Sequence, residues 1–233
     1  MNREKRALLL IGSPRGSKSA SEILGTYLLN KLQEKGMETE RIRIYPVMKS
    51  DKGQDDLLLS VDRSDILVLV FPLYWDSQPS MVVKTMELIA EHRKSIENPK
   101  RHQFIAVSNS GFPEAHHSDT ALAICRRFAK DTGMEWVGSV GIAGGEALGS
   151  MSRVLGGKPL ERLGLLSRNE RKSFDLIAET LATSEIIPQK AIDVRLKRPM
   201  PNWIYILIGT IFLWRRQAKK NNVWNRIYDR PYQ

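Results

Sequence analysis

Short apolar runs of strand length recur along the first part of the chain. Residues 7–11 read ALLLI and residues 65–71 read DILVLVF, and both stretches are apolar almost throughout. A short apolar run bounded by turn residues is typical of a strand that is buried on both faces of a sheet. Together with a more exposed, alternating stretch, the pattern predicts five strands, at residues 7–11, 40–45, 65–71, 104–107 and 135–142.

Between these runs the apolar residues recur at helical spacing. One helix is predicted to begin after a cap at Ser19 or Ser21 and to end at Gly36, because glycine commonly terminates helices. Further helices are predicted at residues 55–62, 80–92 and 118–131. The regular alternation of strands and helices predicts an α/β fold, a doubly wound five-stranded parallel sheet with helices on both faces.

In a doubly wound fold the ligand lies beyond the carboxyl ends of the strands. The segments that follow the first, third, fourth and fifth predicted strands are GSPRGSKS, PLYWDSQP, SNSGFPE and AGGEAL. Because these four loops are expected to meet at one edge of the sheet, they contain the candidate binding residues.

The first loop, GSPRGSKS, is close to two nucleotide-binding motifs and fits neither. A triphosphate-binding loop requires a glycine where Ser17 stands. The magnesium-binding Asp of such proteins is also missing, because the strand ending at Phe71 continues into Pro72. A dinucleotide loop needs three glycines, whereas this loop has Gly12 and Gly16 only. The loop therefore favours neither ATP nor a dinucleotide.

Hydroxyl groups at the start of a helix are the remaining chemical signal of the first loop. Backbone amides and serine side chains at a helix N-terminus can donate to a phosphate group aligned with the helix dipole, which suits a monophosphate. The alternative is that the serines only cap the helix and solubilise a turn. The candidate phosphate-binding residues are Ser13, Arg15, Ser17, Lys18, Ser19 and Ser21.

The second and third loops add flat apolar surface and backbone donors. Pro72, Leu73, Tyr74 and Trp75 bring two large aromatic side chains to a place where an isoalloxazine ring would need a wall. The alternative is that Tyr74 and Trp75 cover the top of the sheet or form a dimer contact. The third loop supplies turn-forming residues whose N–H groups could face the edge of a pyrimidine ring, namely Asn109, Ser110, Gly111 and Phe112.

On these three motifs the sequence resembles the flavodoxin-like NAD(P)H-dependent FMN reductase superfamily. The resemblance covers about residues 7–150 and rests on GSPRGSKSAS, PLYWDSQPSMVVKTME and SNSGFPE. It implies a flavodoxin-like sheet of order 2-1-3-4-5 with a helical C-terminal extension. The family often carries a Ser-Asn-Thr-like triplet in the phosphate loop, whereas this chain reads Lys18, Ser19, Ala20, Ser21. By resemblance, Ser13, Ser19 and Ser21 hold the phosphate of FMN, residues 72–75 border the ring, and residues 109–112 contact its far edge.

The function implied by this resemblance is an FMN-dependent oxidoreductase. It would pass electrons from NAD(P)H to a small-molecule acceptor, such as a quinone, or to a protein partner. The flavin carries the redox chemistry, so no catalytic acid–base pair and no metal site are expected. The alternative is an electron carrier without enzymatic activity, or a docking module that keeps the fold.

Several residues near these loops have a chemical and a structural interpretation. His116 and His117 could donate a proton to an acceptor, or they are solvated residues before a helix. Cys125 shares a helical face with apolar residues, which predicts packing. Asp76 is expected to hold its loop as an Asx turn. The Gly-Gly pair at residues 144–145 favours a tight turn over close approach to a ligand.

Cysteine content and charge limit the cellular setting. A single cysteine excludes an internal disulfide, and a five-residue apolar run after the basic start argues against a signal peptide, so we expect a cytoplasmic protein.

The formal net charge is +10, but residues 1–185 are close to neutral and residues 186–233 carry 10 Lys and Arg against 2 Asp and Glu. We therefore expect a flavodoxin-like domain over residues 1–185 that does not bind nucleic acid, and a basic C-terminal arm over residues 186–233.

The arm contains the apolar stretch WIYILIGTIFLW at residues 203–214, which has no polar face to meet water. A helix of this length is about 18 Å long, too short to cross a bilayer. It could pack on its own domain or in a homodimer, lie on an anionic membrane surface through residues 199–220, or bind a partner protein. The expected location is accordingly the cytoplasm, with possible attachment to the inner face of the membrane.

Overall fold

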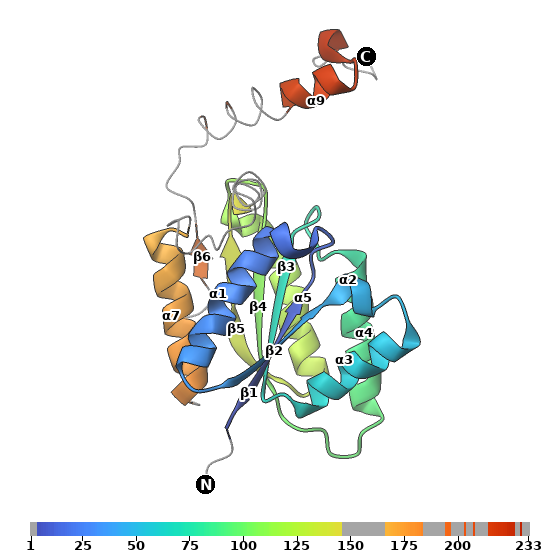
Figure 1. Ribbon diagram of the computed structural model, residues 1–233, viewed down its shortest axis with the longest axis vertical. Coiled ribbons are helices and arrows are strands. Elements are labelled where there is room, and N and C mark those ends of the chain that lie inside the picture. The colour runs from blue at the N-terminus through green and yellow to red at the C-terminus, as the bar shows by residue number, and fades with distance from the viewer. Residues whose placement is uncertain are drawn as a thin grey trace. The chain divides into compact units, whose positions relative to one another are not determined.

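The computed structural model describes residues 4–145, 166–183, 194–196, 203, 207, 214–226 and 229 (Figure 1). The chain divides into two compact units, Met1–Lys197 and Arg198–Gln233. Most of the apolar stretch at residues 203–214, most of the linker at residues 187–201 and the end of the AGGEAL loop lie outside the described residues.

The first unit is built on a parallel sheet of six strands with the order β2-β1-β3-β4-β5-β6. The predicted order 2-1-3-4-5 is confirmed. The sheet positions all the loops discussed below, because in a parallel sheet the carboxyl ends of the strands lie at the same edge. The strands are β1 (Arg6–Ile11), β2 (Glu38–Arg43), β3 (Ile66–Pro72), β4 (Gln103–Asn109), β5 (Glu135–Ile142) and β6 (Val194–Leu196).

The sixth strand was not predicted. β6 pairs in parallel with β5, through Val140 with Val194 and Ile142 with Leu196. Residues 194–196 lie in the arm that was expected over residues 186–233, but they form a strand of the sheet. The first unit accordingly extends to Lys197. A three-residue strand leaves no periodic pattern, and here it lies in a stretch rich in basic residues and proline.

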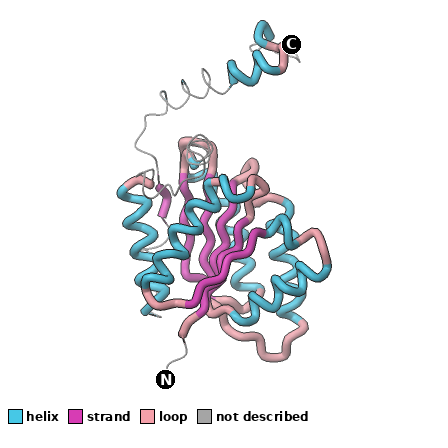
Figure 2. Tube along the Cα trace, viewed as in Figure 1, coloured by secondary structure: helices cyan, strands magenta, loops and turns pink. Residues whose placement is uncertain are grey.

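Helices cover both faces of the sheet (Figure 2). One core cluster joins the sheet to α1 and α7, and the second joins it to α3, α4 and α5. Successive side chains of β1 point to opposite faces of the sheet, so Leu9 belongs to the first cluster, whereas Leu8 and Leu10 belong to the second. This explains why β1 is apolar throughout. Among the residues that the structure describes in this unit, the helices are α1 (Ala20–Glu34), α2 (Ile44–Val47), α3 (Asp51–Arg63), α4 (Ser80–Lys94), α5 (Asp119–Asp131) and α7 (Arg168–Thr183), with short 3-10 turns η1 (Gly16–Lys18) and η2 (Ala115–Ser118).

Several predicted boundaries move, and the described part of the chain contains two additional helices. The strand predicted at residues 40–45 ends at Arg43, because Ile44 begins the one-turn helix α2. The helix predicted at residues 55–62 starts earlier, after Ser50, whose hydroxyl accepts a hydrogen bond from the Gly53 amide. α2 and α7 were not predicted, although Ser167 and Glu170 form a capping box at the start of α7.

Candidate functional site

The loops after β1, β3 and β4 form an open cleft at the carboxyl edge of the sheet. Its volume is about 80 Å³. Each of the three loops contributes to the wall, and the start of α1 forms one end of it. The lining residues are Ser13, Arg15, Ser19, Ala20, Ser21, Pro72, Leu73, Tyr74, Asn109, Ser110 and Gly111.

Three buried serine hydroxyls reach the cleft from the first loop and the start of α1. Ser13 accepts a hydrogen bond from the Arg15 amide (3.3 Å), and Ser19 caps α1 by accepting from the Glu22 amide (3.1 Å). Ser21 accepts from the side-chain amide of Asn109 (2.9 Å). In the described part of the chain none of the three donates a hydrogen bond, so each O–H proton remains to be donated. The cleft therefore offers hydrogen-bond donors to a ligand.

Asn109 joins the first loop to the third. Its Nδ2 donates to Ser21 and also to the carbonyl oxygen of Phe71 (3.0 Å) at the end of β3. Its backbone carbonyl accepts from the Leu73 amide (2.8 Å). The side chain is buried. A single side chain thus holds the ends of β3 and β4 and the start of α1 in one arrangement.

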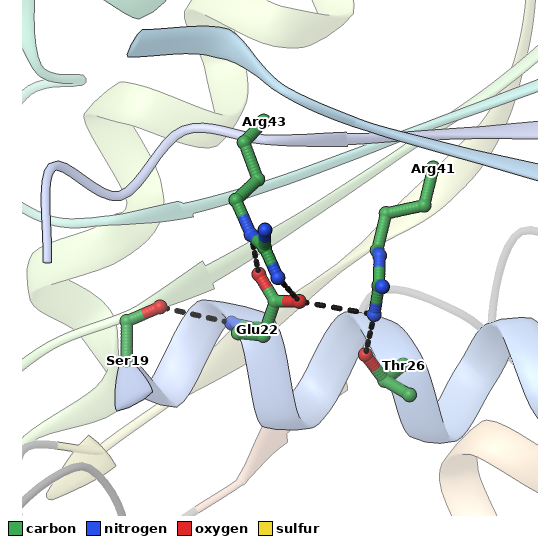
Figure 3. Close-up of polar contacts among 5 residues, drawn as sticks. All are labelled: Ser19, Glu22, Thr26, Arg41 and Arg43. Atoms are coloured by element: carbon green, nitrogen blue, oxygen red, sulfur yellow. Dashed lines mark hydrogen bonds and ion pairs between the residues drawn. The ribbon is translucent and has the colours of Figure 1, made fainter. Parts of the chain in front are cut away.

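A buried carboxylate lies beside the cleft, in the first turn of α1. Glu22 pairs with Arg43 through two hydrogen bonds (2.9 and 2.8 Å) and with Arg41 at 3.0 Å, and Arg41 also contacts Thr26 at 3.4 Å (Figure 3). The hydrogen bond to Glu22 raises the pKa of the Arg43 guanidinium. Without these arginines the carboxylate would repel an anion at the helix N-terminus. With two arginines for one carboxylate, the local charge favours an anion.

The second loop ends in a tight turn. Tyr74 and Ser77 exchange two backbone hydrogen bonds, of 2.9 and 3.3 Å. Trp75 occupies the turn with φ of +55°, a left-handed conformation that is uncommon for a bulky residue, and its side chain is 89% exposed. Tyr74 lines the cleft, whereas Trp75 does not. The turn is closed by its backbone, and the carboxylate of Asp76 lies 3.7 Å from Nδ1 of His117.

The third loop is held by the loop after β5. The Gly144 amide donates to the Phe112 carbonyl (2.8 Å), and the Gly145 amide donates to the Ser110 carbonyl (2.7 Å). Gly144 has φ of +67°, consistent with the predicted turn. Gly145 also permits a close approach, because a Cβ atom there would lie 2.9 Å from Cβ of Asn109. The predicted turn is thus present at Gly144, whereas the close approach at Gly145 is to Asn109 of the same chain.

His116 and His117 form a ring stack next to the third loop. The His117 ring centre lies 4.7 Å from that of Phe112 and 4.6 Å from that of His116. Its Nε2 lies 3.8 Å from the carboxylate of Glu114. Neither histidine lines the cleft.

Ten of the fourteen residues expected to bind a cofactor line the cleft together. The other four, Ser17, Lys18, Trp75 and Phe112, do not. Ser17 and Lys18 belong to the turn η1, and the Phe112 side chain is 45% exposed beside the histidines. Ala20 lines the cleft but was not singled out from the sequence.

The charge cluster around Glu22 was not predicted from the sequence. Two signals for it were present. Ser19 and Glu22 have the spacing of a capping box, and Arg41 and Arg43 are two residues apart in a strand, which places them on one face. What the pattern could not show is that this face of β2 meets the first turn of α1.

The single cysteine packs in the core, as its position on a helical face predicted. Cys125 is fully buried and receives a contact from Gln78 Nε2 at 3.3 Å. Burial raises the pKa of its thiol to about 12.

Among the residues that the structure describes, no group of three or more His, Cys, Asp or Glu is placed to hold a metal ion. No helix in the same part of the chain is long and apolar enough to cross a membrane.

An all-parallel sheet of this order, with a cleft at the carboxyl ends of its strands, defines the class of flavodoxin-like α/β proteins. Residues 5–152 match the model of the Flavodoxin_2 family, which is described by its flavodoxin-like fold, and the chain belongs to this family. The resemblance drawn from the loop motifs is thereby confirmed. A comparison with curated proteins finds no match.

Solved structures show the same fold at low sequence identity. The FMN-dependent NADH-azoreductase from Bacillus anthracis in complex with FMN is 15% identical, with a TM-score of 0.52 over 76% of this chain and 99% of that one. The WrbA-like flavodoxin from Agrobacterium tumefaciens is 14% identical, with a TM-score of 0.53 over 78% and 97%. The rubredoxin oxygen:oxidoreductase from Desulfovibrio gigas is 9% identical, with a TM-score of 0.52 over 77% of this chain but only 35% of its own.

Proposed function

We propose that this protein is an FMN-dependent oxidoreductase that passes electrons from NAD(P)H to a small acceptor. The observation that carries the proposal is the set of three serine hydroxyls at the cleft, which accept hydrogen bonds within the protein and keep their protons for a ligand. The oxygens of an ionised phosphate monoester accept hydrogen bonds and donate none. Such a group therefore complements a cleft that offers hydroxyl donors. The FMN-bound azoreductase of the same fold supports this choice of cofactor.

The N-terminus of α1 adds to the phosphate site. The first amides of a helix have no partner within the helix, and Ala20 and Ser21 at the start of α1 line the cleft. Arg41 and Arg43 neutralise the charge of Glu22, the carboxylate in the first turn of α1. We assign the phosphate of FMN to Ser13, Ser19 and Ser21.

From the size of the cleft we propose where the two ends of the cofactor lie. Sites that enclose a whole ligand of this class typically measure about 300 Å³ or more, whereas this cleft measures about 80 Å³. The enclosed part thus suits the phosphate and the side arm. The ring would lie at the opening, between Tyr74, which is 41% exposed, and the third loop at Ser110 and Gly111.

When bound, FMN supplies the redox chemistry, since it can take a hydride from a nicotinamide and pass electrons on. The residues of this chain have other tasks. Tyr74 and Leu73 shield one side of the opening from water, and Asn109 keeps the phosphate loop in register with the third loop. The ring edge would meet the backbone of the third loop, which the loop after β5 holds through Gly144 and Gly145.

An absorption spectrum of the purified protein tests the proposal. We expect a yellow protein whose band near 450 nm is bleached by NADH or NADPH, and FMN should raise the unfolding temperature of the apoprotein, because a ligand selective for the folded state stabilises it. A colourless protein that FMN neither binds nor stabilises would contradict it and would favour a docking module. A band bleached by dithionite but by neither nicotinamide would favour an electron carrier.

A pair of serine variants tests the phosphate assignment. Ser21→Ala removes one donor, and since hydrogen bonds to charged groups contribute about 1.5–3 kcal/mol, the Kd for FMN should rise by about tenfold or more. Ser60→Ala is the matched control, because Ser60 on α3 donates to Glu40 on β2 (2.7 Å) and does not line the cleft. Equal Kd values in the two variants, measured by quenching of flavin fluorescence, would contradict the assignment.

A further inference from the structure

The second unit, Arg198–Gln233, exposes large apolar side chains. Trp203 is 66% exposed, Leu207 49% and Trp214 67%. The backbone is helical at all three positions. These three large apolar side chains remain in contact with water, which marks an interaction surface.

Basic residues follow directly. α9 (Arg215–Lys220) carries Arg215, Arg216, Lys219 and Lys220, all exposed, and its only buried residue is Ala218. After α9 comes η5 (Trp224–Arg226), and Trp224 packs against two of these cations. The guanidinium of Arg215 lies 5.6 Å from the centre of the Trp224 ring, and Nζ of Lys219 lies 4.9 Å from it.

The charge of the unit is strongly one-sided. Its single acidic residue is Asp229, which is paired with Arg226 at 2.9 Å. The four cations of α9 have no acidic neighbour in the sequence of this unit to neutralise them. An anionic partner would therefore complement α9, and an apolar phase beside it would complement the tryptophans.

We propose that the unit Arg198–Gln233 binds the surface of an anionic lipid bilayer, with Trp203, Leu207 and Trp214 in the interface and the cations of α9 at the headgroups. Tryptophan prefers the interface between headgroups and acyl chains, and basic residues bind anionic headgroups. A surface position also agrees with the length of the apolar stretch, which is too short to span a bilayer.

Two other partners fit less well. A second copy of the chain would bring two strongly basic units together, and like charges repel at such an interface. A nucleic acid would match the cations but would leave the tryptophans in water, since its affinity comes mainly from phosphate contacts. Both are outcomes that the experiment distinguishes.

The test is flotation of the full-length protein with two kinds of vesicle, phosphatidylcholine alone and an equal mixture of phosphatidylcholine and phosphatidylglycerol. We expect binding to the anionic vesicles only, lost at high salt. Replacing all four cations of α9 by Gln should weaken it at least about tenfold. Replacing Trp203 and Trp214 by Ser should also abolish flotation. The charge-matched control replaces Lys52, Lys84, Arg126 and Lys130 of the first unit by Gln, all of them exposed, and should float like the original protein.

Three results would overturn the proposal. The first is equal flotation with both kinds of vesicle or with neither. The second is a dimer in solution that dissociates in the tryptophan variant while no variant floats. The third is binding to a DNA duplex that survives loss of the tryptophans and disappears with the four cations, without vesicle binding. Because flotation needs no flavin, a failure of the proposed enzymatic activity would leave this test unaffected.

Discussion

His102, at the start of β4, should make the fold sensitive to acid. The side chain is fully buried, and Nδ1 donates to the carbonyl oxygen of Ser64 at 3.0 Å. Its Nε2 is buried with no hydrogen-bond partner. Burial, and next the positive charge of Arg93, lower the pKa of His102 to about 4. Lys100 lowers the pKa further, and Asp62 opposes it.

The direction and size of the effect follow from proton uptake. In the unfolded chain His102 takes up a proton near pH 6.5, whereas the folded chain resists this until about pH 4. Between these values the unfolded state binds more protons, so the free energy of unfolding falls as the pH falls. At about 1.4 kcal/mol for each pKa unit, the total is about 3 kcal/mol, of which about 2 kcal/mol is lost by pH 5. Above pH 7 the contribution is constant.

Urea denaturation of the protein and of His102→Asn at several pH values measures this difference. Asn keeps a donor near Ser64 and does not titrate. Between pH 7.5 and pH 5 the free energy of unfolding of the variant should therefore fall by about 2 kcal/mol less than that of the original protein. The carboxylates titrate alike in both proteins and cancel in the comparison. His116→Asn, at an exposed site, should keep the original pH dependence. The same slope in His102→Asn and in the original protein would refute the reasoning.

Three further predictions concern the site and its surroundings. Arg43→Met leaves the buried carboxylate of Glu22 with one arginine and should lower the free energy of unfolding, measured by urea denaturation, by about 2 kcal/mol. The loss is smaller than for a fully buried pair because the Arg43 side chain is 38% exposed, and an unchanged midpoint would contradict this. Gly145→Ala should displace Asn109, whose Cβ would be only 2.9 Å away, and raise the Kd for FMN several-fold in a fluorescence titration. Cys125, with a thiol pKa of about 12, should react with iodoacetamide at pH 8 only after urea unfolds the protein, as followed by mass spectrometry.

Local patterns were sufficient for much of the fold. The buried strands β1 and β3 were visible because a strand covered on both faces must be apolar at every position. The loops after them were recognisable from turn residues and serines, and the parallel topology places such loops at one edge. For that reason ten of the fourteen candidate residues lie together. The four others belong to the same loops, but which way a loop residue faces is not encoded in its sequence position.

The amino-acid sequence by itself determined the class of fold, the positions of the five main strands along the chain and the loops that bear the candidate site, since burial and turn formation depend on neighbouring residues. Only the tertiary structure decided that Asn109 donates to Ser21, 88 residues away, that Glu22 meets Arg43, and that β6 extends the sheet. These contacts depend on register and on the packing of segments remote in the chain. No local period records them, and they are what turns three loops into one cleft.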